Sequence, residues 1–358
     1  MNRETTMRAI RPTLLHAQRG FSLSELMVAS TIGLLILAGM TTLLVNNSRA
    51  QAEIEKANRQ VENGRFAIQS LTADLRNAGY YGEFDPTVLA TPASLPDPCA
   101  LTVAAHRGAL PLPVQGVDGA DASSLACLAD LKDGTDVIVV RRTATCIAGA
   151  PGCAPLSDGG PFFQASLCTA ATELGSGDTA DFYRLDISTA TLNRRQRNCT
   201  TAAATRRYLT HIYYVAANDR AGDGKPTLKR AELGADGTGL SINVVPLVNG
   251  IENLQVEYGL DTSADGVADL FTAAPGSAAG CADAACAAAN WRNVVSVKLN
   301  LLARNLEATA GFTDKKRYVL GYDAAGDPVI DGPKQDAYKR HVFQSLVALP
   351  NPAGRKTP

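Results

Sequence analysis

One long apolar run dominates the hydropathy pattern of the chain. From Leu26 to Val45 no charged residue occurs over 20 positions. A helix of that length rises about 30 Å, which is the thickness of the hydrocarbon core of a bilayer. One carboxylate, Glu25, lies at the start of this segment, and the stretch before it is basic, with Arg3, Arg8, Arg11 and Arg19. Such a flank keeps the amino terminus in the cytoplasm, so the pattern predicts a membrane-spanning helix over residues 21–45.

A secretory signal peptide is the alternative interpretation of this run. Signal peptides have an apolar core of about 7–15 residues and a small-residue cleavage site after it. Here the apolar run is longer, and the polar residues Asn46, Asn47 and Ser48 follow it. The pattern therefore favours a retained span.

After the span, apolar residues recur at alternating intervals of three and four. Gly64 takes one missing place in this stripe, and no proline interrupts residues 21–79. Span and stripe can therefore form one helix of about 85–90 Å, ending at Gly79, with residues 46–79 as its amphipathic continuation. We expect the stripe to pack on the chain's own sheet rather than in a coiled coil with another chain, because strands follow immediately. The stripe consists of Ala50, Ile54, Ala57, Val61, Ile68, Leu71, Leu75 and Ala78.

Beyond residue 80 the pattern changes to short β-branched and aromatic runs separated by Gly, Asn and Asp. Prolines break residues 80–130, and residues 80–204 are predicted to form an irregular, cysteine-rich insertion region with short strands. Residues 205–358 are predicted to be β-rich. One long helix before an antiparallel sheet gives an α+β class. Strands are predicted at 136–141, 182–187, 207–215, 242–247, 253–260, 294–302, 318–322 and 342–349.

All eight cysteines lie beyond the span. An even number on the translocated side indicates disulfides in an oxidising compartment such as the periplasm. Cys146–Cys153 and Cys281–Cys286 enclose short loops and are the favoured pairs, with Cys168–Cys199 and Cys99–Cys127 as further hypotheses. A zinc site is the competing use, but no C-x-x-C motif occurs and the four histidines are scattered. The net charge of −1 gives no general basic field for nucleic acid.

The stretch Gly20-Phe21-Ser22-Leu23-Ser24-Glu25-Leu26 resembles the processing site of type IV prepilins and pseudopilins. The resemblance implies that prepilin peptidase removes residues 1–20 and that the new amino-terminal residue, Phe21, is N-methylated. Glu25 matches the glutamate at the fifth position of the mature family members.

The position of Glu25 at the start of the apolar segment can also be explained physically. A carboxylate in an apolar segment needs a cation, and the span contains no Lys or Arg. The α-amine of Phe21 on a neighbouring subunit would supply one inside a filament and would set the axial register between subunits. The alternative is that Glu25 stays hydrated at the membrane surface.

Several later segments narrow this resemblance. They are Gly64-Arg65-Phe66-Ala67, Leu75-Arg76-Asn77-Ala78-Gly79-Tyr80, His211-Ile212-Tyr213-Tyr214-Val215, Pro226-Thr227-Leu228-Lys229-Arg230, Pro246-Leu247-Val248-Asn249-Gly250-Ile251-Glu252-Asn253-Leu254, Tyr258-Gly259-Leu260-Asp261 and Trp291-Arg292-Asn293-Val294-Val295. Together these segments resemble the PilW family of minor pilins. The resemblance covers about residues 17–84 and 205–349, whereas residues 85–204 have no place in the family pattern. Leu349-Pro350-Asn351 departs from an expected Leu-Arg-Asn.

The resemblance implies a type IV pilin-like structural protein rather than an enzyme. It would stay in the inner membrane by a single pass, with its carboxy-terminal domain in the periplasm, until it enters a pilus. There it would start assembly with other minor pilins and the major pilin, and carry a PilY-type tip adhesin in support of twitching motility, attachment or DNA uptake. One alternative is a minor pseudopilin of a type II secretion system; another is a membrane-anchored periplasmic enzyme or ligand-binding protein.

Motifs for catalysis are missing from the sequence: it has no H-E-x-x-H, no G-x-S-x-G and no complete phosphate loop. Residues 222–227 imitate the end of a phosphate loop but are better interpreted as a turn.

The loop that begins at Asp261 permits a calcium hypothesis, because oxygen side chains stand at its positions 1, 3, 5 and 9, with Gly266 at position 6. Position 12 is Thr272 instead of a glutamate, so a polar hairpin turn is the alternative, and no other cofactor is expected. The four candidate ligands are Asp261, Ser263, Asp265 and Asp269.

Three arginine clusters offer a hypothetical DNA-binding surface. Phosphate binding requires such clusters to lie on one face. Nothing in the sequence gathers them, so solvated loops are favoured and no direct nucleic-acid partner is predicted. The clusters are Arg141-Arg142, Arg194-Arg195-Gln196-Arg197 and Arg206-Arg207.

Overall fold

The structure, a computed structural model, describes residues 20–121, 123–236 and 238–356. The leader residues 1–19, with the four basic residues expected to orient the span, lie outside the described residues. The chain divides into two compact units, one ending at Glu55 and one beginning at Lys56. We call the second unit the head and describe each unit by itself.

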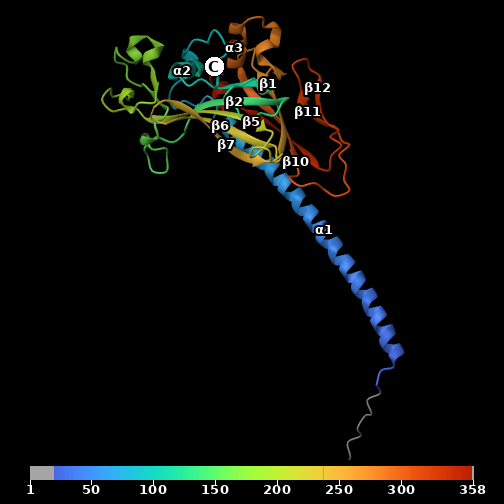
Figure 1. Ribbon diagram of the computed structural model, residues 1–358. Coiled ribbons are helices and arrows are strands. Elements are labelled where there is room, and N and C mark those ends of the chain that lie inside the picture. Colours follow the sequence, from blue (N-terminus) through green and yellow to red (C-terminus); the bar gives the residue numbers. More distant parts are fainter. Residues whose placement is uncertain (1–19, 122, 237, 357–358) are drawn as a thin grey trace, which may run out of the picture. The chain divides into compact units, whose positions relative to one another are not determined.

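Helix α1 (Leu23–Leu75) contributes to both units (Figure 1). Its 53 residues contain no proline, which agrees with the predicted uninterrupted helix. The helix ends at Leu75 rather than at Gly79, because the next residues form tighter turns, such as the 3.0 Å bond from the Asn77 N–H to the Asp74 carbonyl. Gly79 has a φ of +71°, which only glycine adopts readily, and its N–H donates to the Arg141 carbonyl at 2.8 Å.

The larger sheet of the head has seven strands, and every pairing in it is antiparallel. The long strand β5 lies at its centre and pairs with β2, β3 and β6; for example, Tyr213 lies opposite Ile138 of β2 and Arg230 of β6. Its strands are β1 (Val114–Ala120), β2 (Thr135–Thr143), β3 (Phe162–Ala165), β4 (Tyr183–Asp186), β5 (Thr205–Ala216), β6 (Thr227–Ala235) and β7 (Leu240–Asn249).

A second, four-stranded antiparallel sheet has the order β13-β10-β8-β9, and β11 pairs with β12 in a separate hairpin. Figure 1 shows these later strands in orange and red beside the green and yellow strands of the larger sheet. Three short α-helices occupy loops in the described part of the head, besides several short 3-10 helices. The remaining elements are β8 (Ile251–Leu260), β9 (Leu270–Thr272), β10 (Val294–Arg304), β11 (Tyr318–Tyr322), β12 (Pro328–Asp331), β13 (Arg340–Ala348), α2 (Val103–Ala109), α3 (Ala284–Arg292) and α4 (Pro350–Gly354).

One apolar core joins the two sheets to the head portion of α1. Strand β8 lies in the middle of it and is buried at every position. The expected α+β class is confirmed, and the later part of the helical stripe packs on the chain's own sheets as predicted, whereas Ala50 and Ile54 are exposed. The helix contributes Ala67, Leu71 and Leu75 to this core; the larger sheet contributes Ile138, Tyr213 and Leu228; and the smaller sheet contributes Leu254, Val297 and Val347.

The region expected to be irregular is more ordered than predicted. Residues 80–204 supply α2 and strands β1 to β4, and β2 pairs with β5 through six consecutive residues. Strands β1, β3, β6, β9 and β12 were not predicted; in β1, polar and glycine residues such as Gln115 and Gly116 obscure the alternation. The eight predicted strands all exist, and each of their boundaries differs from the prediction by no more than two residues.

Gly64 allows α1 to approach the smaller sheet closely. A Cβ atom at this position would lie 2.1 Å from Cε2 of Phe343 in β13. The ring of Phe343 is itself packed edge-on against His341, with centroids 4.8 Å apart. The missing place in the sequence stripe is therefore a contact point, and any larger residue would push the ring away.

We predict that Gly64→Ala destabilises the chain by about 1–3 kcal/mol, because overpacking outweighs the gain in helix propensity. Chemical denaturation of the full chain in detergent would measure the loss. Gly108→Ala is the matched control, since its added Cβ meets nothing within 4 Å in α2. Adding Phe343→Ala to Gly64→Ala should remove the clash, so a strictly additive double variant would contradict this account.

Candidate functional site

The first turn of α1 joins the expected processing junction to the apolar segment. Ser22 precedes the helix, and its Oγ accepts the N–H of Glu25 at 3.2 Å. In return, Glu25 Oε2 accepts the backbone N–H of Ser22 at 2.9 Å. This reciprocal pair is a capping box, which satisfies two backbone donors that a helix start leaves free. Glu25 therefore helps to begin the helix, a role visible in the spacing of Ser22 and Glu25 that the sequence interpretation missed.

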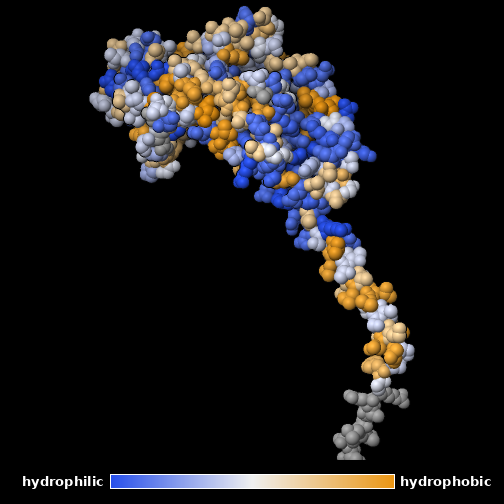
Figure 2. Space-filling model, viewed as in Figure 1, coloured by the Kyte–Doolittle hydropathy of each residue, from blue (hydrophilic) through white to orange (hydrophobic). Residues whose placement is uncertain are grey.

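Gly20 and Phe21 are exposed before this cap, and the Phe21 side chain is 87% exposed. Among the described residues, α1 is the one helix long and apolar enough to cross a membrane. Figure 2 shows its apolar side chains along the segment that precedes the head. An enzyme could reach the Gly20–Phe21 peptide bond, and a lipid or protein environment would cover the exposed leucines.

A buried carboxylate holds the head portion of α1 on the larger sheet. Asp74 Oδ2 accepts the Tyr213 hydroxyl at 2.8 Å and lies 2.7 Å from His211 Nδ1, both on β5. Its Oδ1 accepts Arg142 Nε of β2 at 2.5 Å. Burial alone would raise the pKa of Asp74, but the bond with His211 and the charge of Arg142 outweigh it and hold that pKa well below its ordinary value. Only one rotation of α1 about its axis brings the Asp74 carboxylate to all three of these partners.

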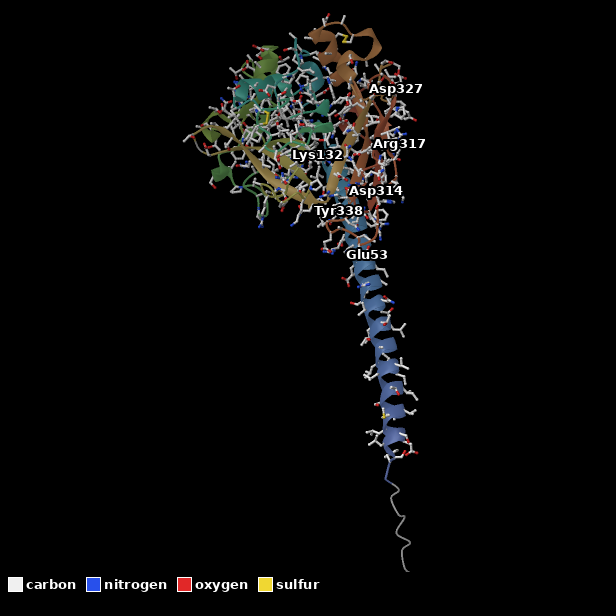
Figure 3. All side chains as sticks on the ribbon, turned by 45° about the vertical axis from the view of Figure 1, so that its right-hand side comes forward. Glu53, Lys132, Asp314, Arg317, Asp327 and Tyr338 are labelled. Carbon is white, nitrogen blue, oxygen red and sulfur yellow. A yellow bond between two sulfur atoms is a disulfide. The ribbon has the colours of Figure 1, made fainter. Side chains whose placement is uncertain are left out.

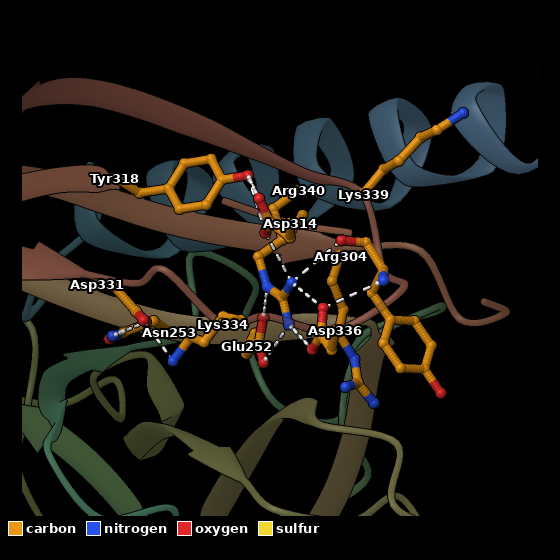
Figure 4. A network of polar contacts seen from close by, with 12 residues as sticks. Glu252, Asn253, Arg304, Asp314, Tyr318, Asp331, Lys334, Asp336, Lys339 and Arg340 are labelled. Atoms are coloured by element: carbon orange, nitrogen blue, oxygen red, sulfur yellow. Dashed lines mark hydrogen bonds and ion pairs between the residues drawn. The ribbon is translucent and has the colours of Figure 1, made fainter. Parts of the chain in front are cut away.

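A second polar network fixes the long segment between β10 and β13 (Figure 4). The Arg340 side chain is fully buried and bonds to Glu252 on β8 at 2.5 Å, to Asp314 at 2.8 Å and to Asp336 at 2.6 Å. Burial opposes the charge of Arg340, but these carboxylates raise its pKa above the ordinary value, and Arg340 lowers the pKa of Asp336. Lys132, in the connection between β1 and β2, approaches Glu252 at 3.9 Å. This network joins three parts of the head without any feature of a reactive site.

The structure brings the cysteines together in four pairs: Cys99–Cys127, Cys146–Cys153, Cys168–Cys199 and Cys281–Cys286. Cys146–Cys153 and Cys281–Cys286 are the pairs that the sequence favoured, and the other two are those offered as further hypotheses. Three of them close loops within residues 80–204, and the fourth lies at the start of α3. A disulfide limits the unfolded ensemble most where the closed loop is long, as in the pairs separated by 28 and 31 residues.

The candidate calcium loop is folded by its own backbone. Asp261 accepts the N–H groups of Ala264 at 2.6 Å and Gly266 at 2.8 Å, and Asp269 accepts that of Thr262 at 2.8 Å. Lys356 Nζ lies 3.5 Å from Asp261 and supplies a positive charge. The carboxylate oxygens therefore face donors, which corresponds to the hairpin-turn alternative. Ser263 and Asp265 lie in the same loop, but no group of three metal-binding side chains occurs within the described parts of the chain.

The arginine clusters do not form one phosphate-binding face. Arg141 is buried, and Arg142 is engaged by Asp74. In the next cluster, Arg194 lies 3.5 Å from Asp181 and Arg195 lies 2.5 Å from Glu173. The guanidinium groups of Arg142, Arg194 and Arg195 thus form ion pairs with carboxylates of the head instead of standing ready for phosphate.

Two family models match the chain, one near its amino terminus and one in its carboxy-terminal part. Residues 212–351 match the family model described as Type IV Pilus-assembly protein W, and residues 15–41 match the Prokaryotic N-terminal methylation motif. The chain is similar to the PilW family over its carboxy-terminal part, residues 212–351. It is thus a pilin-like protein associated with type IV pili, and the amino-terminal motif indicates membrane anchoring.

Two further comparisons add little to the family assignment. No curated protein sequence matches the chain. A solved structure, a type IV-like pilin from Thermus thermophilus, is similar over 82% of this chain and 96% of its own, with 13% identity and a TM-score of 0.32. The matched family consists of structural pilin proteins.

We predict that Asp74→Asn destabilises the head by about 3–5 kcal/mol, because it leaves Arg142 and its neighbours without their buried anion. Since the pKa of Asp74 is lowered on folding, its ionised form stabilises the chain above pH ~4, and this stabilisation is lost as the pH falls below that value. Melting temperatures measured between pH 2 and 7 should therefore fall less steeply with acid in the variant. Asp327→Asn is the control, since Asp327 is exposed in the β11–β12 turn (Figure 3); an equal change in both variants would contradict the assignment.

Proposed function

We propose that this chain is a PilW-family minor pilin that helps to start assembly of a type IV pilus and becomes part of the complex at its tip. The observation that carries the proposal is the exposed Gly20–Phe21 junction, placed directly before a capped, proline-free apolar helix. A prepilin-type processing signal needs a peptide bond that the peptidase can reach, followed by an apolar segment that a membrane or a filament can cover. The family match over residues 212–351 supports a pilus rather than a type II secretion system.

The sequence of events follows from the chemistry of the amino terminus. Prepilin peptidase removes residues 1–20, and Phe21 becomes an N-methylated amino terminus. The chain waits in the inner membrane with residues 21–45 as its span, and the head lies in the periplasm, where the four disulfides are stable. On assembly, α1 leaves the lipid for the filament core. Its partners are other minor pilins, the major pilin and a PilY-type tip adhesin, in support of twitching motility, adhesion or DNA uptake.

Glu25 has the central role in the assembly step. In an apolar filament core its charge needs a cation, and the Phe21 amine of a neighbouring subunit provides one. A subunit in the wrong axial position would leave both charges unpaired. The capping box adds a condition, because the same carboxylate also accepts the Ser22 N–H.

We predict that the mature chain isolated from membranes begins at N-methylated Phe21, as determined by mass spectrometry. Gly20→Val should leave the chain starting at Met1, because a side chain is introduced at the residue preceding the cut. Gly39→Ala, at a position in the same segment where an added Cβ meets nothing within 4 Å, should be processed normally. A wild-type chain that keeps Met1, or one cut after the apolar run, would refute prepilin processing.

We predict that Glu25→Gln lowers the number of pili per cell to that of a strain lacking the gene, while cleavage after Gly20 continues. Glutamine at this position can still close the capping box but carries no charge. Glu25→Ala removes both functions and should give the same loss. Electron microscopy of surface pili is the measurement. Normal pilus numbers with glutamine and a loss only with alanine would show that capping, and not the charge, is what assembly requires.

A further inference from the structure

Strand β13 is an unprotected edge of the smaller sheet. Within the described strands it pairs only with β10, just as β7 pairs only with β6 at an edge of the larger sheet. Strand β7 carries Pro246, which has no N–H to offer, and a register shift in its pairing with β6. Proline and irregular pairing are common protections against strand addition. Strand β13 has neither, and its nine paired residues follow one continuous register.

The hydrogen-bond pattern shows which backbone groups of β13 are available. The N–H of Leu349 donates to Val295 at 2.8 Å, and the N–H of Asn305 donates to Lys339 at 3.0 Å. Both pairs belong to the β10–β13 register, in which bonded pairs alternate along an antiparallel ladder. Odd-numbered residues of β13 therefore bond to β10, and the N–H and C=O groups of residues 342, 344, 346 and 348 point outward. Within the described parts of the chain, no residue bonds to these outward groups.

A groove runs beside this edge. It has a volume of about 520 Å³, with α1 on one side and β13 on the other. Its apolar lining comes from Ile68 and Ala73 of the helix and from Phe343 of the strand, the ring that also packs on Gly64. The groove thus combines unpaired backbone groups with an apolar wall, which are the two components that bind an extended peptide.

Two arginines give the groove a charge. Arg65 and Arg76 line it, both are exposed, and neither forms an ion pair with a described residue. They stand 11 positions apart on α1, or about 16 Å along the helix axis. That separation equals about five residues of extended chain. A strand lying in the groove would therefore meet a positive charge near each end.

We propose that the groove between α1 and β13 binds an extended acidic segment of a partner protein, which adds to β13 as a new edge strand. The outward N–H and C=O groups of β13 supply the ladder, and Arg65 and Arg76 select for acidic side chains. The inference concerns the head alone and does not depend on pilin processing or filament assembly. A second copy of this chain joined edge to edge is the competing occupant.

The test uses the full chain in detergent and two fluorescent peptides about as long as β13, one alternating Val with Glu and the other Val with Lys. Fluorescence anisotropy should show binding of the Glu peptide and at least about tenfold weaker binding of the Lys peptide. Leu346→Pro removes one outward N–H and should weaken binding about tenfold. Leu346→Ala is the matched control, because it loses the same exposed side chain and keeps the N–H.

Charge reversal separates recognition from misfolding. The double variant Arg65→Glu with Arg76→Glu should lose the Glu peptide and gain the Lys peptide, which an unfolded protein could not do. Equal binding of both peptides by the wild-type chain would overturn the proposal, as would unchanged binding by Leu346→Pro. Concentration-dependent dimers that Leu346→Pro abolishes, without peptide binding, would assign the edge to a second copy and also overturn it.

Discussion

The arrangement of the head depends on one buried carboxylate, that of Asp74, which needs hydrogen-bond donors around it. Asp74 lies on the face of α1 that enters the core, where an unpaired charge would be strongly destabilising. Its donors come from two different strands, β2 and β5, so the helix is fixed in both rotation and height on the larger sheet. Gln60 and Asn63 extend this constraint, because Gln60 donates to the carbonyls of Ala303 and Lys339, and Asn63 donates to that of Asn249. Polar side chains of the helix thus bind the ends of strands from both sheets.

The position of the helix follows from the same contacts. Apolar packing alone is tolerant of small rotations, whereas a charged group with three directed partners is not. A second acid strengthens the connection between the sheets: Asp136 of β2 accepts the Val256 N–H of β8 at 2.7 Å and the Gly119 N–H at 2.8 Å. Burial raises the pKa of Asp136 to about 7, and neighbouring Asp118 adds to this. The core is therefore mostly apolar, and a few polar groups such as Asp74 and Asp136 fix how the helix and the sheets are oriented in it.

The sequence predicts the helix, the strand-rich class and the processing motif because each depends on local pattern. The apolar stripe and the absence of proline are sufficient to predict α1, although its end lies at Leu75 rather than at Gly79. The partners of Asp74 are not predictable in this way, since a carboxylate in a helix pattern is ordinarily assigned to the solvent side. Its pairing with His211 and Tyr213 depends on how α1 lies over β5, 137 and 139 positions later. Strand β6 was missed because Arg230 and Glu232, which pair with each other, interrupt its apolar alternation.

The two contacts of Glu25 are compatible because its carboxylate has two oxygens. Oε2 accepts the Ser22 N–H, whereas Oε1 has no partner within the described residues. In the proposed filament, an incoming amine could therefore bind Oε1 while the helix cap persists. The cap would even favour that contact, since it restricts the side chain before the neighbour arrives and lowers the entropy lost on pairing. In that proposed filament, a serine three residues before the glutamate would serve assembly by orienting the charge, in addition to starting the helix.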